Sequence, residues 1–274
     1  MSSINHNAGS LTHPPGVRVR HGSPAAGAVI ARLYSPMRAH IEVVEDVTAA
    51  ALEVVLATMA AAAETSGRVV MCLSGGSTPL PLYRALAQRH DLPWSETVLT
   101  WGDERYVNHD HPDSNYGAAR SALIDHVAVA PANVLPWPEG PSPSRAAAAY
   151  GTTLAARLGP AGSFDLNIMG LGTDGHCASL FPGTGAVLRD DATFALEVPG
   201  FGWRMTMGAR RLSDSHTTLF VVSGEDKRKA LRDTFGPAAH EPGADSPAAL
   251  DTYPARAVGA HGRLVVITDV DFMS

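Results

Sequence analysis

The sequence predicts an α/β protein with a mainly parallel sheet that is covered by helices on both faces. Two observations support this fold class. Short apolar runs that are typical of strands alternate along the chain with segments whose apolar residues recur at helical spacing. Several of these strand candidates are apolar at every position, which indicates burial on both faces of a sheet.

The predicted elements follow from these patterns in order along the chain. After a first strand, Asp46 is a favourable N-cap, and the apolar residues that follow it recur at helical spacing up to Ala62. Strands are expected at 41–44, 68–73, 97–101, 164–171, 217–222 and 263–268, with a short extended pair at 134–135. Further helices are expected through Leu82 and Leu86 and over 114–124, 144–158 and 226–235. Residues 240–247 are expected to form a surface loop.

The length of the chain sets the domain organisation that we expect. With 274 residues, of which 45% are hydrophobic, the chain can fill the core of one large domain. Residues 1–36 are rich in Gly, Ser, Pro and His and are expected to form a flexible or loosely docked leader. Residues 37–274 are expected to form a single α/β domain, with a monomer as the default assembly.

Charge and cysteine content argue against several classes of protein. The chain has 21 Lys and Arg residues, 27 Asp and Glu residues and a net charge of −6, so neither a nucleic acid nor an anionic membrane is an expected partner. Cys72 and Cys177 form no CxxC pair, which argues against a zinc ribbon or a disulfide scaffold and favours the reducing cytoplasm. The chain has no unbroken run of about 18 apolar residues and no signal-peptide pattern, so no membrane-spanning helix is expected.

Three of the predicted strands end in polar, glycine-rich loops at 74–79, 102–106 and 172–179. The carboxyl ends of parallel strands meet at one edge of a sheet, and ligands bind at that edge in open α/β folds. This coincidence is the main functional signal in the sequence.

The first loop, SGGSTP at 74–79, has the composition of an anion cradle. Its glycines allow backbone N–H groups to approach a ligand, Thr78 is a candidate helix cap, and Pro79 suits the first helical position. A helix N-terminus with such donors suits a phosphate. The residues expected to hold that phosphate are Ser74, Gly75, Gly76, Ser77 and Thr78. The loop lacks the Gly-Lys-Ser/Thr ending of a Walker loop, and an ordinary capped turn is the alternative interpretation.

The second loop, GDERY at 102–106, places three charges directly after an apolar strand. The planar guanidinium of Arg105 is suited to a phosphate, and Asp103 is suited to orienting a neighbouring imidazole. The alternative is a surface pair between Glu104 and Arg105 that contributes little to stability. Ser114 is expected to cap the helix that follows.

The third loop contains His176 in a glycine-rich turn. An imidazole has a reference pKa of about 6.5, so a histidine in such a loop is a candidate general base. The alternative is a histidine that caps a helix and has no chemical role. No metal site is expected, because His176 has no second His or Cys at a suitable spacing and the tract at 109–111 is most simply a solvated loop. Gly-x-Ser-x-Gly and dinucleotide-binding fingerprints are both missing from the sequence.

Together these motifs resemble the 6-phosphogluconolactonase family. The matching segments, in that family's order and spacing, read LSGGSTP at 73–79, WGDER at 101–105, SNY at 114–116 and GLGTDGHCASLFP at 170–182. The resemblance implies the three-layer αβα fold shared with glucosamine-6-phosphate isomerase/deaminase, of the NagB/RpiA/CoA transferase-like type. It also implies hydrolysis of 6-phospho-D-glucono-1,5-lactone to 6-phosphogluconate in the oxidative pentose phosphate pathway, without a metal or other cofactor.

The resemblance assigns roles to individual residues. His176 matches the catalytic histidine, Arg105 and residues 74–78 match phosphate-binding positions, and Lys227 matches a lysine that also meets the phosphate. Arg204 matches the arginine of a degenerate Arg-Val-Thr segment. Two choices stay open: either Asp103 or Asp174 orients the imidazole, and the oxyanion is bound by backbone N–H groups near 172–175 or near 75–76.

Two alternative functions remain at this point. The deaminase branch of the same fold carries Asp-Gly-His-Ile-Ala-Phe-Asn-Glu, but residues 177–181 read CASLF, so the glutamate of that branch is absent. A sugar-phosphate sensor without activity would keep the phosphate cradle and need no base. The chain also departs from the lactonase pattern at Asn108, at Cys177, near Pro199 and at 269–271.

Overall fold

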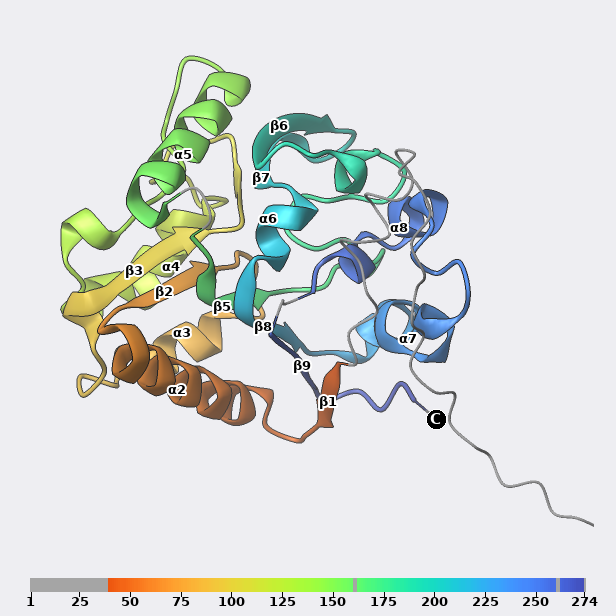
Figure 1. The fold of residues 1–274 in the computed structure, drawn as a ribbon, viewed down its shortest axis with the longest axis horizontal. Helices are drawn as coiled ribbons and strands as arrows, with labels where there is room; N and C mark the ends of the chain where they lie inside the picture. Colours follow the sequence, from red (N-terminus) through yellow and green to blue (C-terminus); the bar gives the residue numbers. More distant parts are fainter. Residues whose placement is uncertain (1–38, 160–161, 260–261, 274) are drawn as a thin grey trace, which may run out of the picture.

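Strands that are buried at nearly every position form the centre of a six-stranded parallel sheet (Figure 1). The computed structural model describes residues 39–159, 162–259 and 262–273. Its strands lie in the order β1 (His40–Val43), β9 (Arg263–Thr268), β8 (Ser215–Val222), β5 (Phe164–Met169), β2 (Val69–Leu73) and β3 (Thr97–Trp101). Every residue of β2 and β3 is buried, as the lack of apolar–polar alternation predicts. The predicted leader at 1–36 lies outside the described residues.

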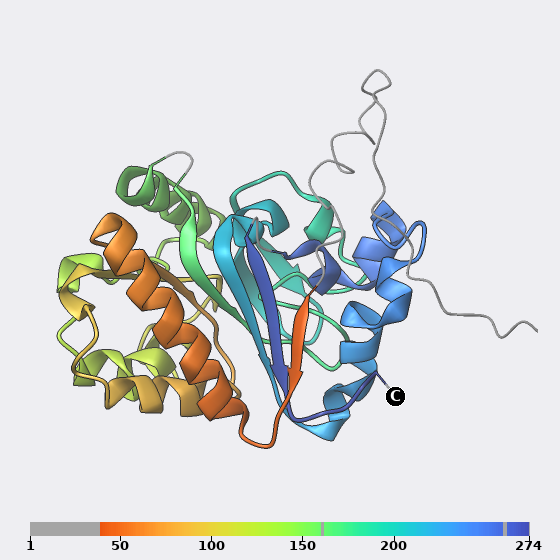
Figure 2. The ribbon, with the colours of Figure 1, turned by 60° about the horizontal axis from the view of Figure 1, so that its bottom comes forward.

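Helices cover both faces of this sheet, which confirms the predicted three-layer αβα class (Figure 2). On one face α2 (Val47–Ser66) packs on the sheet, α3 (Leu80–Ala87) packs on α2, and α4 (Asn115–Ala122) packs on α3. The helices α7 (Arg228–Phe235) and α8 (Pro247–Thr252), blue in Figure 2, lie on the opposite face.

Helix α2 is apolar because it forms part of the core. Asp46 caps it as predicted, accepting a hydrogen bond from the backbone N–H of Ala49 at 2.9 Å, and Gly67 ends it in the left-handed conformation. By length and composition it is the one described helix that is apolar enough to cross a membrane. The criterion of an unbroken apolar run misses it because Glu53 and Glu64 interrupt the run. One stripe of the helix is buried against β2, β5, β8 and β9.

The apolar pattern does not predict a second, three-stranded antiparallel sheet. In this sheet β7 (Gly202–Met207) lies between β4 (Asp103–Arg105) and β6 (Thr193–Val198), and α5 (Pro143–Leu158) packs on β6 and β7. The expectation that 102–106 is a loop is therefore wrong for β4. A strand of three charged residues has no apolar periodicity, and only its pairing with a distant segment defines it.

Smaller differences concern where elements end. The strand predicted over 164–171 ends at Met169, and the helix predicted over 226–235 begins with a 3-10 turn, Glu225–Lys227. The helix predicted over 114–124 ends at Ala122. The short helices α6 (Ala209–Ser213) and α8 are not predicted, since five or six residues carry little periodicity.

The sheet has a topological switch point between β2 and β5. The chain leaves β2 toward β3 on one side, whereas it leaves β5 toward β8 on the other side. Connections that diverge in this way leave a crevice at the carboxyl ends of the two strands, where ligands bind in open α/β sheets. The segments that begin at this point are the 74–79 turn and the 170–179 loop.

Candidate active site

His176 and Asp174 form a hydrogen-bonded pair in the loop after β5. The Nδ1 atom of His176 lies 2.6 Å from Oδ1 of Asp174, and the backbone N–H of His176 donates to the same oxygen at 3.0 Å. A carboxylate at Nδ1 favours the imidazole tautomer that carries its proton there, which leaves Nε2 free to accept a proton. The side chain of His176 is 29% exposed, so solvent and ligands can reach it.

The carboxylate of Asp174 stays ionised in this arrangement. Partial burial alone would raise the pKa of Asp174, but the hydrogen bonds from the ring and the backbone of His176 outweigh burial and lower that pKa. An ionised carboxylate at Nδ1 stabilises the positive charge that the imidazole acquires when it takes a proton. Of the two carboxylates that the sequence leaves open as the partner of the imidazole, Asp174 is the one in contact with it.

Gly172 makes room for this pair. A Cβ atom at residue 172 would lie 2.1 Å from Nδ1 of His176 and 2.6 Å from Oδ1 of Asp174. We therefore expect Gly172→Ala to displace the imidazole and, if His176 is the general base that the sequence predicts, to lower kcat by roughly 10- to 100-fold. Steady-state kinetics and thermal unfolding would measure the loss of activity and the retention of the fold.

Gly170→Ala is the matched control for this prediction, because a Cβ at residue 170 would meet only Oγ of Ser74 at 3.8 Å. An ordinary contact of this kind should leave kcat within about twofold. Equal activity in the two variants would show that the ring can move aside without loss.

Asp103 does not contact the imidazole but forms a buried junction beneath the site. It is 8% exposed, and its Oδ2 accepts a hydrogen bond from Oγ of Ser179 at 2.6 Å. Its Oδ1 and its backbone carbonyl accept from Nδ2 of Asn115 at 3.2 and 3.0 Å. Gly75 lies against the same asparagine, since a Cβ there would be 1.8 Å from Oδ1 of Asn115. The junction therefore joins the loop of His176, the start of α4 and the 74–79 turn.

A tyrosine hydroxyl holds the 74–79 turn in place. The hydroxyl of Tyr83 donates to the carbonyl of Ser74 at 2.7 Å and accepts from the N–H of Ser74 at 2.9 Å. Helix α3 begins at Leu80 with Pro79 at the cap position and no side-chain capping bond, so the prediction that Thr78 caps this helix is wrong. Gly76 has a φ of 88°, a conformation that favours glycine.

The carboxylate of Glu104 binds backbone N–H groups, two of them at the start of α4, and does not form a surface ion pair with Arg105. Its carboxylate accepts hydrogen bonds from the backbone N–H groups of Arg105 at 2.8 Å, Asn115 at 2.7 Å and Tyr116 at 2.8 Å. Burial raises the pKa of Glu104 although these bonds oppose the shift. Ser114 caps the same helix as predicted, accepting from the N–H of Gly117 at 3.0 Å. Glu104 therefore positions the strand that carries Arg105.

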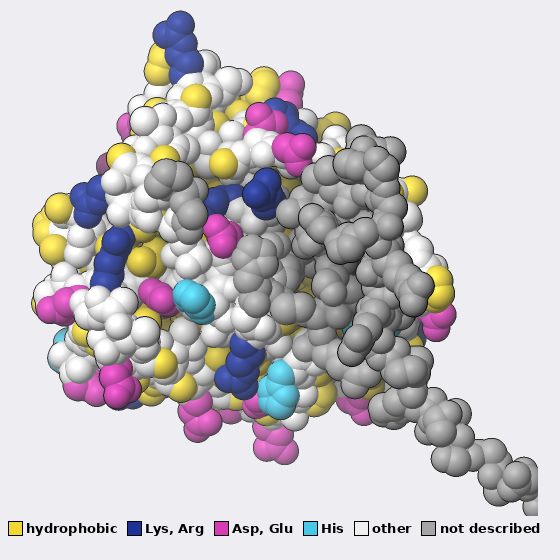
Figure 3. Space-filling model, viewed as in Figure 1, with side chains coloured by type: hydrophobic (Ala, Val, Ile, Leu, Met, Phe, Trp, Pro, Cys, Tyr) yellow, Lys and Arg dark blue, Asp and Glu magenta, His cyan; other side chains and the backbone are white. Residues whose placement is uncertain are grey.

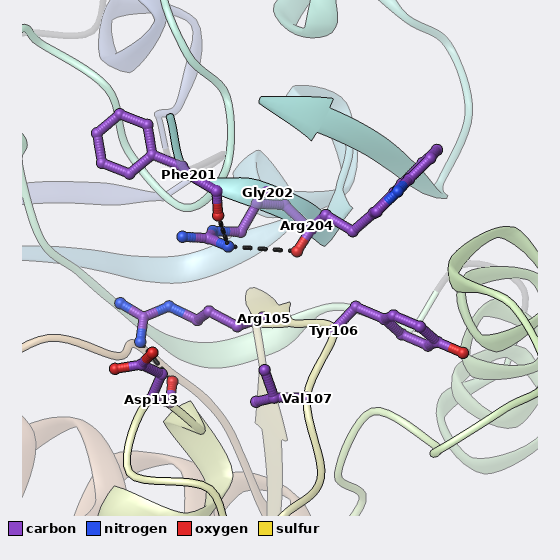
Figure 4. Close-up of a pocket in the computed structure, with 8 residues that line it drawn as sticks. Arg105, Tyr106, Val107, Asp113, Phe201, Gly202 and Arg204 are labelled. Atoms are coloured by element: carbon purple, nitrogen blue, oxygen red, sulfur yellow. Dashed lines mark hydrogen bonds between the residues drawn. The ribbon is translucent and has the colours of Figure 1, made fainter. Parts of the chain in front are cut away.

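Two arginines face one cavity of about 330 Å³. Arg105 in β4 and Arg204 in β7 are register partners in the antiparallel sheet, and Figure 4 shows their guanidinium groups extending to the same side. Arg105 donates to the carbonyl of Asp113, and Arg204 donates to the carbonyl of Phe201 at 2.5 Å. Burial lowers the pKa of Arg204, and the neighbouring charge of Arg105 lowers it further. Like charges opposite each other on paired strands are unfavourable unless an anion lies between them.

Aromatic rings connect this cavity to the imidazole. The ring of Phe181 stacks on His176 with centroids 4.2 Å apart and planes inclined by 25°. Phe201, which lines the cavity, lies 5.1 Å from Phe181, centroid to centroid. Neither phenylalanine is predicted as a site residue. Phe181 could have been found, because it lies in the matched segment 170–182, whereas nothing in the sequence singles out Phe201.

Lys227 lies in the turn after β8, at the same sheet edge. Its Nζ atom is 4.0 Å from Oδ2 of Asp226, and its side chain is 20% exposed. Asp269 holds this turn by accepting from Oγ of Ser223 at 2.5 Å and from the N–H of Gly224 at 2.9 Å. Lys227 is therefore placed at the rim by strand topology, whereas Arg105 and Arg204 share a cavity.

In the face of the molecule that Figure 3 shows, the Lys and Arg side chains of the described residues are scattered among Asp and Glu. Among the described residues, no three His, Cys, Asp or Glu side chains are grouped so that they could hold a metal ion.

Comparisons with known proteins identify the family. Residues 42–266 match the family model described as glucosamine-6-phosphate isomerases/6-phosphogluconolactonase. The chain is 38% identical over 208 residues to a 6-phosphogluconolactonase of Synechocystis sp., covering 74% of this chain and 82% of that protein. It is 36% identical over 241 residues to a 6-phosphogluconolactonase of Nostoc sp., covering 85% and 96%.

A solved structure shows the same fold. The 6-phosphogluconolactonase of Thermotoga maritima superposes with a TM-score of 0.74 at 26% identity, covering 84% of this chain and 99% of that one. The chain belongs to the glucosamine-6-phosphate isomerase/6-phosphogluconolactonase family.

Proposed function

We propose that this chain hydrolyses 6-phospho-D-glucono-1,5-lactone to 6-phospho-D-gluconate, the lactonase step of the oxidative pentose phosphate pathway. The names of the Synechocystis and Nostoc relatives support this reaction. The observation that carries the proposal is the pair of His176 and Asp174, connected through two aromatic rings to a cavity that two arginines line.

The arginines bind the 6-phosphate. Arg105 and Arg204 supply two positive charges and several N–H donors on one side of the cavity, which suits a dianion. The phosphate lies at the far end of the sugar from the lactone carbonyl. Its binding energy therefore positions the carbonyl without taking part in bond breaking. Lys227 and the hydroxyl groups of Ser77 and Thr78 contribute further donors at the same sheet edge, which leaves the N–H groups of Gly75 and Gly76 for the other end of the substrate.

His176 acts as the general base. Nε2 takes a proton from a water molecule, whose oxygen attacks the carbonyl carbon and forms a tetrahedral oxyanion. The oxyanion then collapses, the bond from the carbonyl carbon to the ring oxygen breaks, and the imidazolium returns the proton to that oxygen. The products are a free hydroxyl and a carboxylic acid, which releases a proton to solvent. Water is the only co-reactant that these steps need.

The oxyanion is expected to meet the glycine turn after β2. In the loop of His176, the N–H of Gly172 donates to the carbonyl of His176 at 2.8 Å, and the N–H of Gly175 donates to the carbonyl of Gly172 at 3.0 Å. Both N–H groups therefore already form hydrogen bonds within the loop of His176. This favours Gly75 and Gly76 as the source of donors for the oxyanion.

Asp174→Asn is expected to lower kcat by roughly 10- to 1,000-fold, because the amide cannot stabilise the imidazolium as a carboxylate does. The pKa of Asp174 lies below its usual value, so in the unaltered chain this carboxylate stays ionised from pH 8 down to about pH 5. A fall in activity within that range therefore reports a group other than Asp174. Measuring kcat against pH for both proteins, with thermal unfolding as the check on the fold, tests this role. An unchanged kcat in the variant would remove Asp174 from the mechanism.

The isomerase/deaminase reaction of the same family is the weaker candidate. The glutamate of that branch would fall at residue 181, where the apolar ring of Phe181 stacks on the imidazole and cannot carry a proton. A sensor without activity would not need the pair of His176 and Asp174. Following proton release from freshly made lactone, corrected for spontaneous hydrolysis, distinguishes the lactonase from both alternatives.

The proposal includes a cytoplasmic location and a monomer. Cys72 and Cys177 are both buried and unpaired, which is typical of proteins that fold in a reducing compartment. Nothing in the proposed mechanism requires a residue from a second copy of the chain.

A further inference from the structure

Phe201 is a large apolar side chain in an unusual place. It lies in the turn between β6 and β7, where Gly200 and Gly202 have φ values of 79° and 72°, and it is 54% exposed. Exposing a phenylalanine to water is unfavourable relative to burying it, because the apolar ring stays in contact with solvent. Among the exposed large apolar residues of the described chain, Phe201 lines the cavity of the two arginines, so its ring is available to contact a bound ligand.

The ring lies between the two halves of the site. On one side it contacts Phe181, which is 6% exposed and itself stacks on His176. On the other side it lines the cavity that contains Arg105 and Arg204 (Figure 4). Phe201 is therefore placed to contact a molecule that has one end on the arginines and its reacting atom at the imidazole.

Arg204 holds the backbone of this turn. Its Nη1 donates to the carbonyl of Phe201 at 2.5 Å and to the carbonyl of Trp203 at 3.2 Å, and its guanidinium carbon lies 6.0 Å from the centroid of the Phe201 ring. Arg204, which lines the cavity, thus also holds the backbone that carries the aromatic ring.

We propose that Phe201 is a specificity-determining residue that packs against the C–H face of the sugar ring. This inference rests on the proposed function. The phosphate and the carbonyl lie at opposite ends of the lactone, and contacts at the two ends alone leave the ring free to rotate about the line between them. An aromatic face offers the C–H groups of one sugar face an apolar surface and removes this freedom. A cavity of about 330 Å³ is of the size that a six-carbon sugar phosphate requires.

The test compares a closed-ring sugar phosphate with the anion alone. Glucose 6-phosphate has a ring and a 6-phosphate but no reactive carbonyl, whereas inorganic phosphate has no ring. Calorimetric titration of Phe201→Ala should show a roughly 5- to 20-fold higher Kd for glucose 6-phosphate and a Kd for inorganic phosphate within about twofold of the unaltered chain. Phe201→Trp, which keeps an aromatic face, should restore binding of the sugar phosphate.

Met273→Ala is the matched control, because Met273 is 53% exposed and does not line the cavity. It should leave both dissociation constants unchanged. Equal weakening of the two ligands in Phe201→Ala would show that the ring only maintains the turn that Arg204 binds. Unchanged binding of glucose 6-phosphate, or no binding of it by the unaltered chain, would overturn the inference.

The two proposals fail separately. Proton release from the lactone tests the proposed function alone. A chain that binds glucose 6-phosphate through Phe201 but hydrolyses no lactone would overturn the function and keep this inference. If the chain hydrolyses the lactone and Phe201→Ala leaves KM unaffected, the proposed function is kept and this inference is overturned.

Discussion

Replacing His176 with alanine is expected to lower kcat by roughly 10²- to 10⁴-fold, the usual contribution of a well-placed general base. KM should stay within about twofold, because the arginines that we propose to hold the phosphate are untouched. Proton release from freshly made lactone, at several enzyme concentrations to separate catalysis from spontaneous hydrolysis, measures both constants. Circular dichroism or thermal unfolding checks that the variant folds.

His216→Ala is a suitable control for this experiment. His216 is exposed in β8, a strand that shares the sheet with β5, but it lies at the amino end of its strand, opposite the rim that carries His176. Its removal should leave kcat unaltered. Near-normal turnover by His176→Ala would show that another group activates the water.

Arg105→Ala is expected to raise KM for the phosphorylated lactone by roughly 10- to 100-fold, since a hydrogen bond to a charged group contributes about 1.5–3 kcal/mol. Arg204→Ala should act in the same direction, because the two guanidinium groups line one cavity. Lys227→Ala should have a smaller effect, because Lys227 does not line the cavity that the two arginines share. Steady-state kinetics with the phosphorylated lactone and with unphosphorylated gluconolactone distinguish phosphate binding from a general loss of structure.

Activity on unphosphorylated gluconolactone shows whether Arg105→Ala impairs phosphate binding or the structure of the site as a whole. If Arg105 holds the phosphate, the variant should lose little activity on gluconolactone, whereas equal losses on both substrates would contradict that role. Arg89→Ala serves as the control, because Arg89 is paired with Asp91 on the surface at 2.7 Å and should affect neither substrate.

The fold could be predicted wherever burial leaves a pattern in the sequence. Strand β2 is apolar at every position, and α2 repeats its buried residues at helical spacing. The second sheet could not be predicted, because β4 consists of three polar residues whose strand conformation depends on pairing with β7, about a hundred residues away. Long-range pairing of this kind leaves no local signal.

Most of the individual residues of the candidate site could be predicted from the sequence, but the contacts between their side chains could not. The loop with His176 and the strand with Arg105 stand out because charged or catalytic residue types follow apolar strands. The choice between Asp103 and Asp174 depends on side-chain directions, which only the structure shows. Phe201 carries no sequence signal, since a single aromatic residue near glycines has many structural explanations.

The opposed guanidinium groups of Arg105 and Arg204 also bear on how long the protein persists in a cell. A ligand that binds only the folded chain stabilises it by RT ln(1 + [L]/Kd), about 2.7 kcal/mol when the ligand is at a hundred times its Kd. If the phosphate lies between the two arginines as proposed, relief of the repulsion between these cations is part of that gain. Degradation that depends on transient unfolding is therefore slowest when sugar phosphates are abundant, so the metabolite supply protects the enzyme that consumes it.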